Sequence, residues 1–233
     1  MIYFVYQSLL VTGLVFCTFK RLQNHSAGHD FKTGWNLALI LMLGGFIGGR
    51  LFHVLYEYPE VYWAAPLRVL KFWEGGFVFF GGVLLALPIA LVYLRQAKQS
   101  FWTWADFYAP VVALGYALGR FGCFLAGCCY GTFCDAPWAI EQRHPTQLYA
   151  MATELALYFY LIRKEKSEPA PGKIFALWLI GHGLGRLFME NFRADFRGGA
   201  FMGLSISSWL SLILFSAGLA IYLGLRAPNE RKN

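Results

Sequence analysis

The sequence has 233 residues, of which 58% are hydrophobic and 14% are charged. Soluble domains carry about 25% charged residues and roughly 45–50% apolar ones, so this composition excludes an ordinary soluble domain and indicates a chain surrounded mostly by lipid. The net charge of +7 does not indicate a nucleic-acid partner, because the basic residues flank apolar segments and no basic run contains interleaved aromatic residues.

Seven apolar segments approach the roughly 20 residues that a membrane-spanning helix needs. They predict an all-α, polytopic membrane protein with a single transmembrane domain over residues 1–233. The first segment has no positively charged start and no small-residue cleavage site, so we expect a retained span and not a signal peptide. The expected spans lie at residues 2–19, 35–56, 77–94, 107–125, 148–162, 174–189 and 205–225.

Most lysines and arginines lie in the loops that follow the odd-numbered spans, and the positive-inside rule makes those loops cytoplasmic. This predicts an outer N-terminus and a cytoplasmic C-terminus. On the outer side, residues 58–74 contain Trp63, Trp73 and two prolines. They are expected either as an amphipathic arm on the membrane surface or as a plain loop. Residues 128–147 are expected as a second outer segment.

Three arginines, Arg50, Arg120 and Arg186, lie beside glycines inside or at the ends of expected spans. An arginine at membrane depth costs roughly 2.5–3.5 kcal/mol, so it usually faces a polar cavity or a partner. Guanidinium groups bind phosphate through two parallel hydrogen bonds, and glycines let a bulky ligand approach the backbone. The pattern predicts a phosphate site. The alternative is structural pairing with acidic residues, or a side chain that extends to the interface.

Arg186, Glu190 and Arg193 have the spacing i, i+4, i+7, which places them on one helix face. Glu190 is therefore expected to orient either arginine, or to form only a salt bridge at the helix end. His144 precedes the fifth span and is a candidate general base, although a capping or hydrogen-bonding role is the alternative. His182 is a second candidate.

Four of the five cysteines are close together in the sequence, at Cys123, Cys128, Cys129 and Cys134. Their C-x4-C-C-x4-C spacing is not a standard zinc pattern, which would show C-x2-C pairs. We therefore expect no metal site. Helix packing with small residues explains Cys123 and Cys128, and a disulfide that includes Cys134 is an alternative if the outer compartment is oxidising.

Three stretches carry a family resemblance. Gly119 to Phe124 reads G-R-F-G-C-F and is followed by Gly131; Arg143 to Tyr149 reads R-H-P-T-Q-L-Y; Arg186 to Glu190 reads R-L-F-M-E. In this order they resemble the G-R-x-G-N-F, R-H-P-[ST]-Q-L-Y and R-F-x-x-E motifs of the prolipoprotein diacylglyceryl transferases. Gly75 to Gly82 is similar to that family's G-G-x-x-x-H-G-G.

The resemblance implies a transferase of the bacterial inner membrane that needs no cofactor. Its partners would be membrane lipid, with phosphatidylglycerol as donor, and a prolipoprotein signal peptide whose lipobox cysteine is the acceptor. Arg120 and Arg186 match the family's phosphate-handling arginines. The expected site has Arg120, Arg186 and His144 as catalytic residues and Arg50, Gly119, Gly122, Gly131, Arg143, Gln147, Tyr149, Glu190 and Arg193 as substrate-binding residues.

The sequence departs from the family pattern at three positions. Phe80 stands where the family usually has a histidine, Cys123 where the signature has an asparagine, and Cys128 where it has an acidic residue. These departures leave open a non-catalytic paralog that binds anionic lipid or lipoprotein as a membrane scaffold. A transporter is less favoured, because the sequence has no internal repeat.

Overall fold

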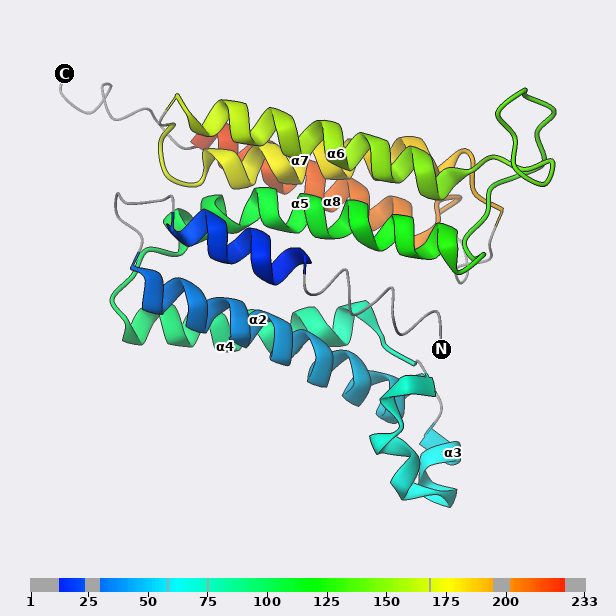
Figure 1. Cartoon of the computed structure of the whole chain (residues 1–233), viewed down its shortest axis with the longest axis horizontal. Helices are drawn as coiled ribbons and strands as arrows, with labels where there is room; N and C mark the ends of the chain where they lie inside the picture. Colours follow the sequence, from blue (N-terminus) through cyan, green and yellow to red (C-terminus); the bar gives the residue numbers. More distant parts are fainter. Residues whose placement is uncertain are drawn as a thin grey trace. The chain divides into compact units, whose positions relative to one another are not determined.

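In the part of the chain that it describes, the computed structural model consists of helices joined by turns and loops (Figure 1). That part consists of residues 13–23, 30–57, 59–74, 76–167, 169–194 and 202–224, without the side chains at positions 57, 74, 79 and 80. Within these ranges the structure has isolated β-bridges and no β-strand. The prediction of an all-α fold is therefore confirmed for the described residues. The side chain of Phe80 lies outside them.

The chain divides into two compact units. One is Val15–Phe101, and the other joins Met1–Leu14 to Trp102–Asn233. The first unit contains a helical segment at residues 15–23 and two long helices, α2 (Phe31–Phe52) and α4 (Phe79–Gln96), which lie side by side (Figure 1).

Helices α2 and α4 pack closely because glycines face each other across the pair. A Cβ atom built on Gly48 would lie 2.4 Å from the carbonyl oxygen of Gly81, and one built on Gly44 would lie 2.8 Å from Cα of Ala86. Small residues four positions apart are the usual way for membrane helices to approach. Asp30 fixes the start of α2, since its carboxylate accepts from the Thr33 backbone N–H at 2.9 Å and hydroxyl at 2.8 Å.

The segment between α2 and α4 forms short helices with an exposed apolar face. Its elements are a π-helical turn (His53–Glu57), α3 (Pro59–Ala64), η2 (Pro66–Leu70) and η3 (Phe72–Glu74). Trp63, Leu67 and Leu70 are exposed by 82%, 78% and 67%. These side chains suit the arm predicted at residues 58–74, and its position at the membrane surface stays a prediction.

Arg50, at the end of α2, is 6% exposed and binds the backbone of this arm. Its guanidinium donates to the carbonyl oxygens of Arg68 at 2.8 Å, Val69 at 3.1 Å, Lys71 at 3.2 Å and Gly76 at 3.2 Å. These bonds account for a buried charge without a ligand. Substrate binding by Arg50 stays a prediction.

The second unit is a bundle of long helices that runs through the later part of the chain (Figure 1). They are α5 (Phe101–Leu125), α6 (Thr146–Glu165), α7 (Lys173–Glu190) and α8 (Ile206–Gly224). Gly183 lets α7 contact α8, because a Cβ there would lie 2.8 Å from the Ser211 carbonyl oxygen. Asp106 of α5 fixes the start of α7 by accepting from the backbone N–H groups of Gly172 at 2.6 Å and Phe175 at 2.7 Å.

Three described helices are long and apolar enough to cross a membrane: Phe31–Tyr56, Phe101–Leu125 and Ile206–Gly224. A shorter apolar helix covers Gly81–Gln96. Helices α6 and α7 occur where two further spans were predicted, but they carry several charged residues. The predicted span at residues 2–19 lies mostly outside the described part. The structure supports a helical membrane protein, and the count of seven spans stays a prediction.

Candidate active site

Arg120 is positioned by a chain of contacts that crosses three helices. Its guanidinium carbon lies 4.7 Å from the ring centre of Tyr116, one turn earlier in α5. The His182 imidazole of α7 meets the same ring edge-on at 4.8 Å. His182 in turn binds Glu154 of α6, with 2.5 Å between Nδ1 and Oε1. A carboxylate, an imidazole and an aromatic ring therefore act in series to hold one guanidinium.

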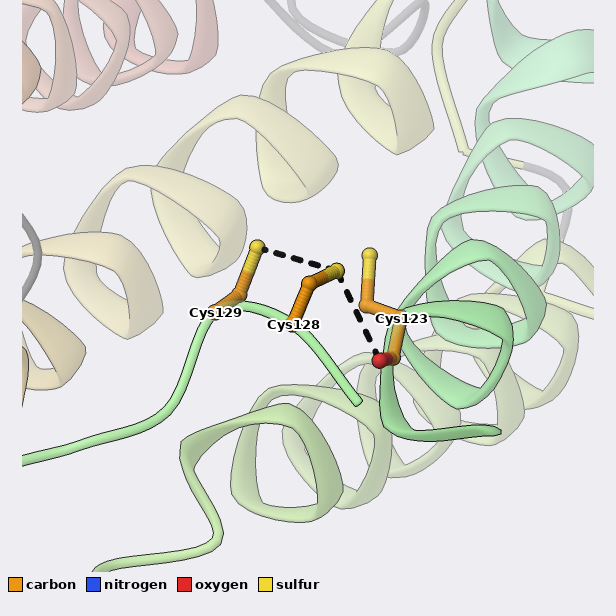
Figure 2. A group of neighbouring side chains, drawn as sticks. All are labelled: Cys123, Cys128 and Cys129. Atoms are coloured by element: carbon orange, nitrogen blue, oxygen red, sulfur yellow. Dashed lines mark hydrogen bonds between the residues drawn. The ribbon is translucent and has the colours of Figure 1, made fainter. Parts of the chain in front are cut away.

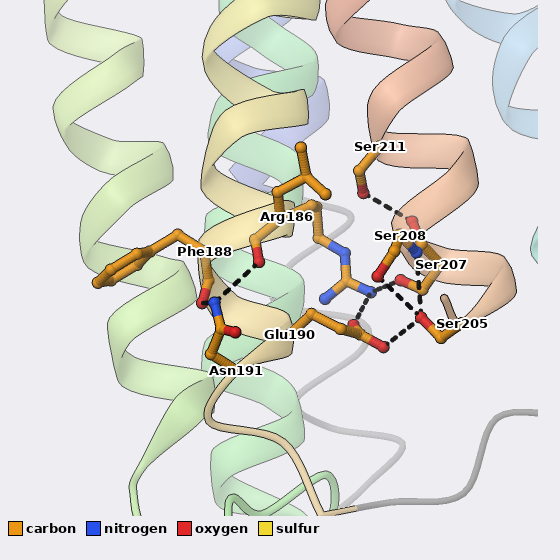
Figure 3. Close-up of polar contacts among 9 residues, drawn as sticks. Arg186, Phe188, Glu190, Asn191, Ser205, Ser207, Ser208 and Ser211 are labelled. Carbon is orange, nitrogen blue, oxygen red and sulfur yellow. Dashed lines mark hydrogen bonds and ion pairs between the residues drawn. The ribbon is translucent and has the colours of Figure 1, made fainter. Parts of the chain in front are cut away.

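Arg186 of α7 is held from α8 and from its own helix (Figure 3). Its Nη2 donates to the Ser207 hydroxyl and lies 3.7 Å from Oε2 of Glu190. The other oxygen of Glu190 accepts from the Ser205 hydroxyl at 2.6 Å. The pairing expected from the i, i+4 spacing of Arg186 and Glu190 is thus present, and Ser207 of α8 and Ser205, just before α8, extend it.

Arg186 retains a donor that no described residue satisfies. Its Nη1 is buried without a hydrogen-bond partner among the described residues, and so is the Tyr116 hydroxyl. Leaving such a group unpaired costs about 1–3 kcal/mol, more when it is charged. The positive charges of Arg120 and Arg193 also act on Arg186. Grouped guanidinium charges with an unused donor form a site for an anion.

Gly131 brings Arg193 and His144 together. It forms an antiparallel bridge with Arg193, and its N–H donates to the His144 carbonyl at 3.0 Å. A Cβ atom at this position would lie 2.6 Å from the Phe192 carbonyl oxygen and 2.7 Å from Cβ of His144. A glycine is therefore required at position 131 for steric reasons, since any larger side chain would separate the loop from the residues that follow α7.

The His144 ring is supported by Tyr149 and Phe192. Its Nδ1 lies 3.3 Å from the Tyr149 hydroxyl, which accepts from Trp138 Nε1 at 2.7 Å. Phe192 packs edge-on against the imidazole at 5.1 Å. If Nδ1 donates to Tyr149, Nε2 is the nitrogen that can accept a proton.

Two other predicted residues hold the loop between α5 and α6. Arg143 donates to the Gly131 carbonyl at 3.3 Å and lies 4.2 Å above the Phe133 ring. Gln147 is 1% exposed and donates to the Cys128 carbonyl at 2.6 Å. Both side chains shape the loop, and their contact with substrate stays a prediction.

The signature glycines of α5 have different surroundings. Apart from its own helix backbone, no described part of the chain comes within 4 Å of a Cβ built on Gly119, whereas the Gly122 carbonyl accepts from the Ala126 N–H in the last turn. Direct substrate contact at either glycine stays a prediction.

Three cysteine thiols meet at the end of α5 (Figure 2). The Sγ atoms of Cys123, Cys128 and Cys129 all lie within 4.8 Å of one another. Hydrogen bonding with the Cys123 and Cys128 thiols, together with the Arg193 guanidinium, holds the pKa of Cys129 below its usual range, against the opposing effect of burial.

Sequence reasoning missed four residues of the site: Tyr116, Glu154, Ser205 and Ser207. Glu154 had a signal, because it is the only charged residue in the expected span at residues 148–162, and an acid inside a span marks a functional site by default. The serines had no such signal, since hydroxyls are common between membrane helices.

Residues 4–224 match the family model described as prolipoprotein diacylglyceryl transferase. A phosphatidylglycerol–prolipoprotein diacylglyceryl transferase of Bordetella parapertussis is 36% identical over 236 residues, which cover 96% of this chain and 90% of that protein. The protein of the same name from Nitrosomonas europaea is 38% identical over 216 residues, which cover 82% of this chain and 77% of that protein. The chain therefore belongs to the prolipoprotein diacylglyceryl transferase family.

Proposed function

We propose that this protein transfers the diacylglyceryl group of phosphatidylglycerol to the lipobox cysteine of prolipoproteins in the bacterial inner membrane. The thiolate sulfur attacks the carbon of the diacylglycerol unit that is joined to the phosphate. A C–S bond forms there, and the bond between that carbon and the phosphate oxygen breaks. Glycerol phosphate leaves with the bonding electrons, and the thiol proton passes to a base. The names of the relatives support this pair of substrates.

The observation that carries the proposal is the buried Nη1 of Arg186, which has no hydrogen-bond partner in the described part of the chain and lies under the charges of Arg120 and Arg193. A phosphodiester would satisfy this donor and neutralise part of the repulsion among the guanidinium groups. In a membrane, the phosphate group of a lipid is the anion available to this site.

The same groups favour the transition state. Negative charge develops on the leaving phosphate oxygen as the C–O bond breaks, and Arg120 and Arg186 stabilise it without having to move. A preorganised donor of this kind contributes about 2.7–4 kcal/mol in other enzymes. The positive field also favours the lipobox thiolate over the thiol.

We assign the proton acceptor to His144. Phe80 stands where the family usually has a histidine and cannot accept a proton. His182 is bound through Nδ1 to Glu154, which is 4% exposed, so we assign it a positioning role toward Tyr116 and Arg120. His144 lies in a loop, beside the strand-like contact between Gly131 and Arg193.

We also propose seven spans, an outer N-terminus and a cytoplasmic C-terminus. The positive-inside count supports this orientation, which places the loop between α5 and α6 on the outer side. Reporter fusions after Lys98 and Lys166 should report cytoplasm and one after Thr132 the outer side. A C-terminal fusion that reports the outer side would overturn the orientation.

One experiment separates transfer from scaffolding. The chain is expressed in a bacterium depleted of its own transferase, and labelled diacylglycerol on a lipobox peptide is measured in its membranes. Growth together with labelled peptide supports the transferase. Binding of phosphatidylglycerol by the purified protein without labelled peptide would instead support the non-catalytic lipid-binding scaffold.

A further inference from the structure

The thiols of Cys123, Cys128 and Cys129 form a compact three-sulfur group that the transfer mechanism does not use (Figure 2). All three are free cysteines, and the sulfurs of Cys128 and Cys129 lie 3.6 Å apart. Cys134, the fourth cysteine of the sequence cluster, is not in this group. The structure thus groups three of the four cysteines, which the C-x4-C-C-x4-C spacing alone did not distinguish from one another.

The backbone is shaped to bring these sulfurs together. Neighbouring side chains on an extended chain point in opposite directions, but Cys129 has φ 65°, a left-handed conformation that costs a non-glycine residue about 1–2 kcal/mol. Gly127, also at φ 65°, turns the chain so that the Cys128 N–H donates to the Cys123 carbonyl at 3.1 Å. Strain of this kind persists where the surroundings hold it, and it often marks a functional site.

Two buried side chains hold the strained turn. Thr146 donates to the Cys129 carbonyl at 2.9 Å, and Gln147 donates to the Cys128 carbonyl at 2.6 Å. Both residues are 1% exposed. The carbonyl groups of the vicinal cysteines are therefore fixed from the first turn of α6, and the thiols are organised before any ligand binds.

The sulfur separations match the coordination of a single ion. Zn²⁺ binds thiolate at about 2.3 Å in tetrahedral geometry, which places two ligand sulfurs roughly 3.8 Å apart. The Sγ atoms of Cys128 and Cys129 are 3.6 Å apart, slightly closer than this value, and no two of the three Sγ atoms are more than 4.8 Å apart. Small side-chain rotations would therefore bring all three sulfurs onto one ion.

The charge around the group also suits a thiolate site. Three thiolates and one divalent cation have a net charge of −1. The positive charge of Arg193 acts on Cys129, and that of Arg120 acts on Cys123. A negative complex is stabilised by two such guanidinium groups, whereas three neutral thiols would gain little from them.

Although their spacing did not predict a metal site, we propose that Cys123, Cys128 and Cys129 bind one Zn²⁺ ion through three thiolates and leave its fourth position to water or to an external ligand. The site goes beyond the proposed transfer reaction. Three protein ligands with one open position are typical of zinc sites that exchange a ligand. Thiolates select a soft or borderline cation over Mg²⁺ or Ca²⁺.

The test uses the full-length protein, reduced and metal-free in detergent, with Co²⁺ as the spectroscopic probe and Zn²⁺ as its competitor. We expect thiolate-to-cobalt charge-transfer bands that saturate at one Co²⁺ per chain and disappear when Zn²⁺ is added. Cys128→Ser should abolish the bands, and the matched control Cys134→Ser, in the same loop, should retain them. Bands that persist in Cys128→Ser, or their absence from the unaltered protein, would overturn the proposal.

A second measurement does not depend on any variant. X-ray absorption of the zinc-loaded, unaltered protein should show three sulfur neighbours at about 2.3 Å. A zinc shell of oxygen and nitrogen alone would overturn the assignment. So would mass-spectrometric detection of a disulfide between two of the three cysteines in protein isolated without reductant, because the group would then be a redox pair.

Discussion

Nδ1 of His182 in α7 lies 2.5 Å from Oε1 of Glu154 in α6, and the imidazole ring contacts Tyr116, over which the Arg120 guanidinium lies. Glu154 is 4% exposed. The pair therefore links the packing of α6 and α7 to the orientation of an arginine in α5. It is a structural connection between helix assembly and the orientation of an arginine that we propose binds phosphate.

Glu154→Ala should weaken both stability and transfer. Removing one partner of a buried hydrogen-bonded pair typically costs about 3–5 kcal/mol, and the imidazole would lose the group that fixes its orientation. The measurement is thermal unfolding in detergent beside the KM for phosphatidylglycerol. Glu154→Gln is the control that keeps a hydrogen-bond acceptor. If Glu154→Ala lowers stability and leaves KM and kcat unchanged, the pair has no positioning role.

Arg120→Ala and Arg186→Ala should each lower transfer by about 10²–10³, the loss typical of one preorganised donor, while the protein still inserts into the membrane. Lysine replacements should also fail, because a point charge does not reproduce the guanidinium fork. Transfer onto a labelled lipobox peptide is the assay. Arg163→Ala, at an exposed position of α6, is the matched control. Near-normal transfer by both alanine variants would remove the phosphate-binding argument.

Gly131→Ala should reduce transfer strongly, because its Cβ would lie 2.6 Å from the Phe192 carbonyl oxygen and push the loop away from Arg193. Gly185→Ala is the control, since no described residue beyond its own helix backbone lies within 4 Å of a Cβ there and alanine favours a helix by about 1 kcal/mol over glycine. Activity and thermal unfolding are measured for both variants. Equal activities would show that the contact between the loop and α7 does not matter for the reaction.

Helix positions followed from the sequence wherever apolar runs were long. The run expected at residues 107–125 is the end of α5, which begins earlier, at Phe101. Its first turn contains Trp102 and Trp104. Aromatic residues of this kind are typical of membrane interfaces, and a span defined only by its most apolar residues leaves them out. Helix α2 also begins earlier than the expected span at residues 35–56, because Asp30 caps the helix before the apolar run begins.

The site was only partly predictable. The glycine-flanked arginines and the i, i+4 pair of Arg186 with Glu190 were visible because their cost at membrane depth and their spacing are local properties. The contacts of His182 with Tyr116 and Glu154 depend on the register of three helices, which no local pattern encodes. The close approach of the Cys128 and Cys129 thiols depends on the left-handed backbone conformation of Cys129. A glycine in the sequence predicts such a conformation, but a cysteine does not.

His144→Ala should lower turnover by roughly 10²–10⁴, the loss typical of a general base. Raising the pH should partly restore the rate, because the lipobox thiol ionises without help as the pH approaches its ordinary pKa of about 8.5. Tyr149→Phe should have a smaller effect, since it removes the hydroxyl that contacts Nδ1 at 3.3 Å but leaves the imidazole in place. Both variants are compared with the unaltered protein by transfer of labelled diacylglycerol across pH 6 to roughly 9. Unchanged turnover in His144→Ala at the lower end of that range would assign the proton to another acceptor, and the positive field of Arg120 and Arg186 would then suffice to ionise the thiol.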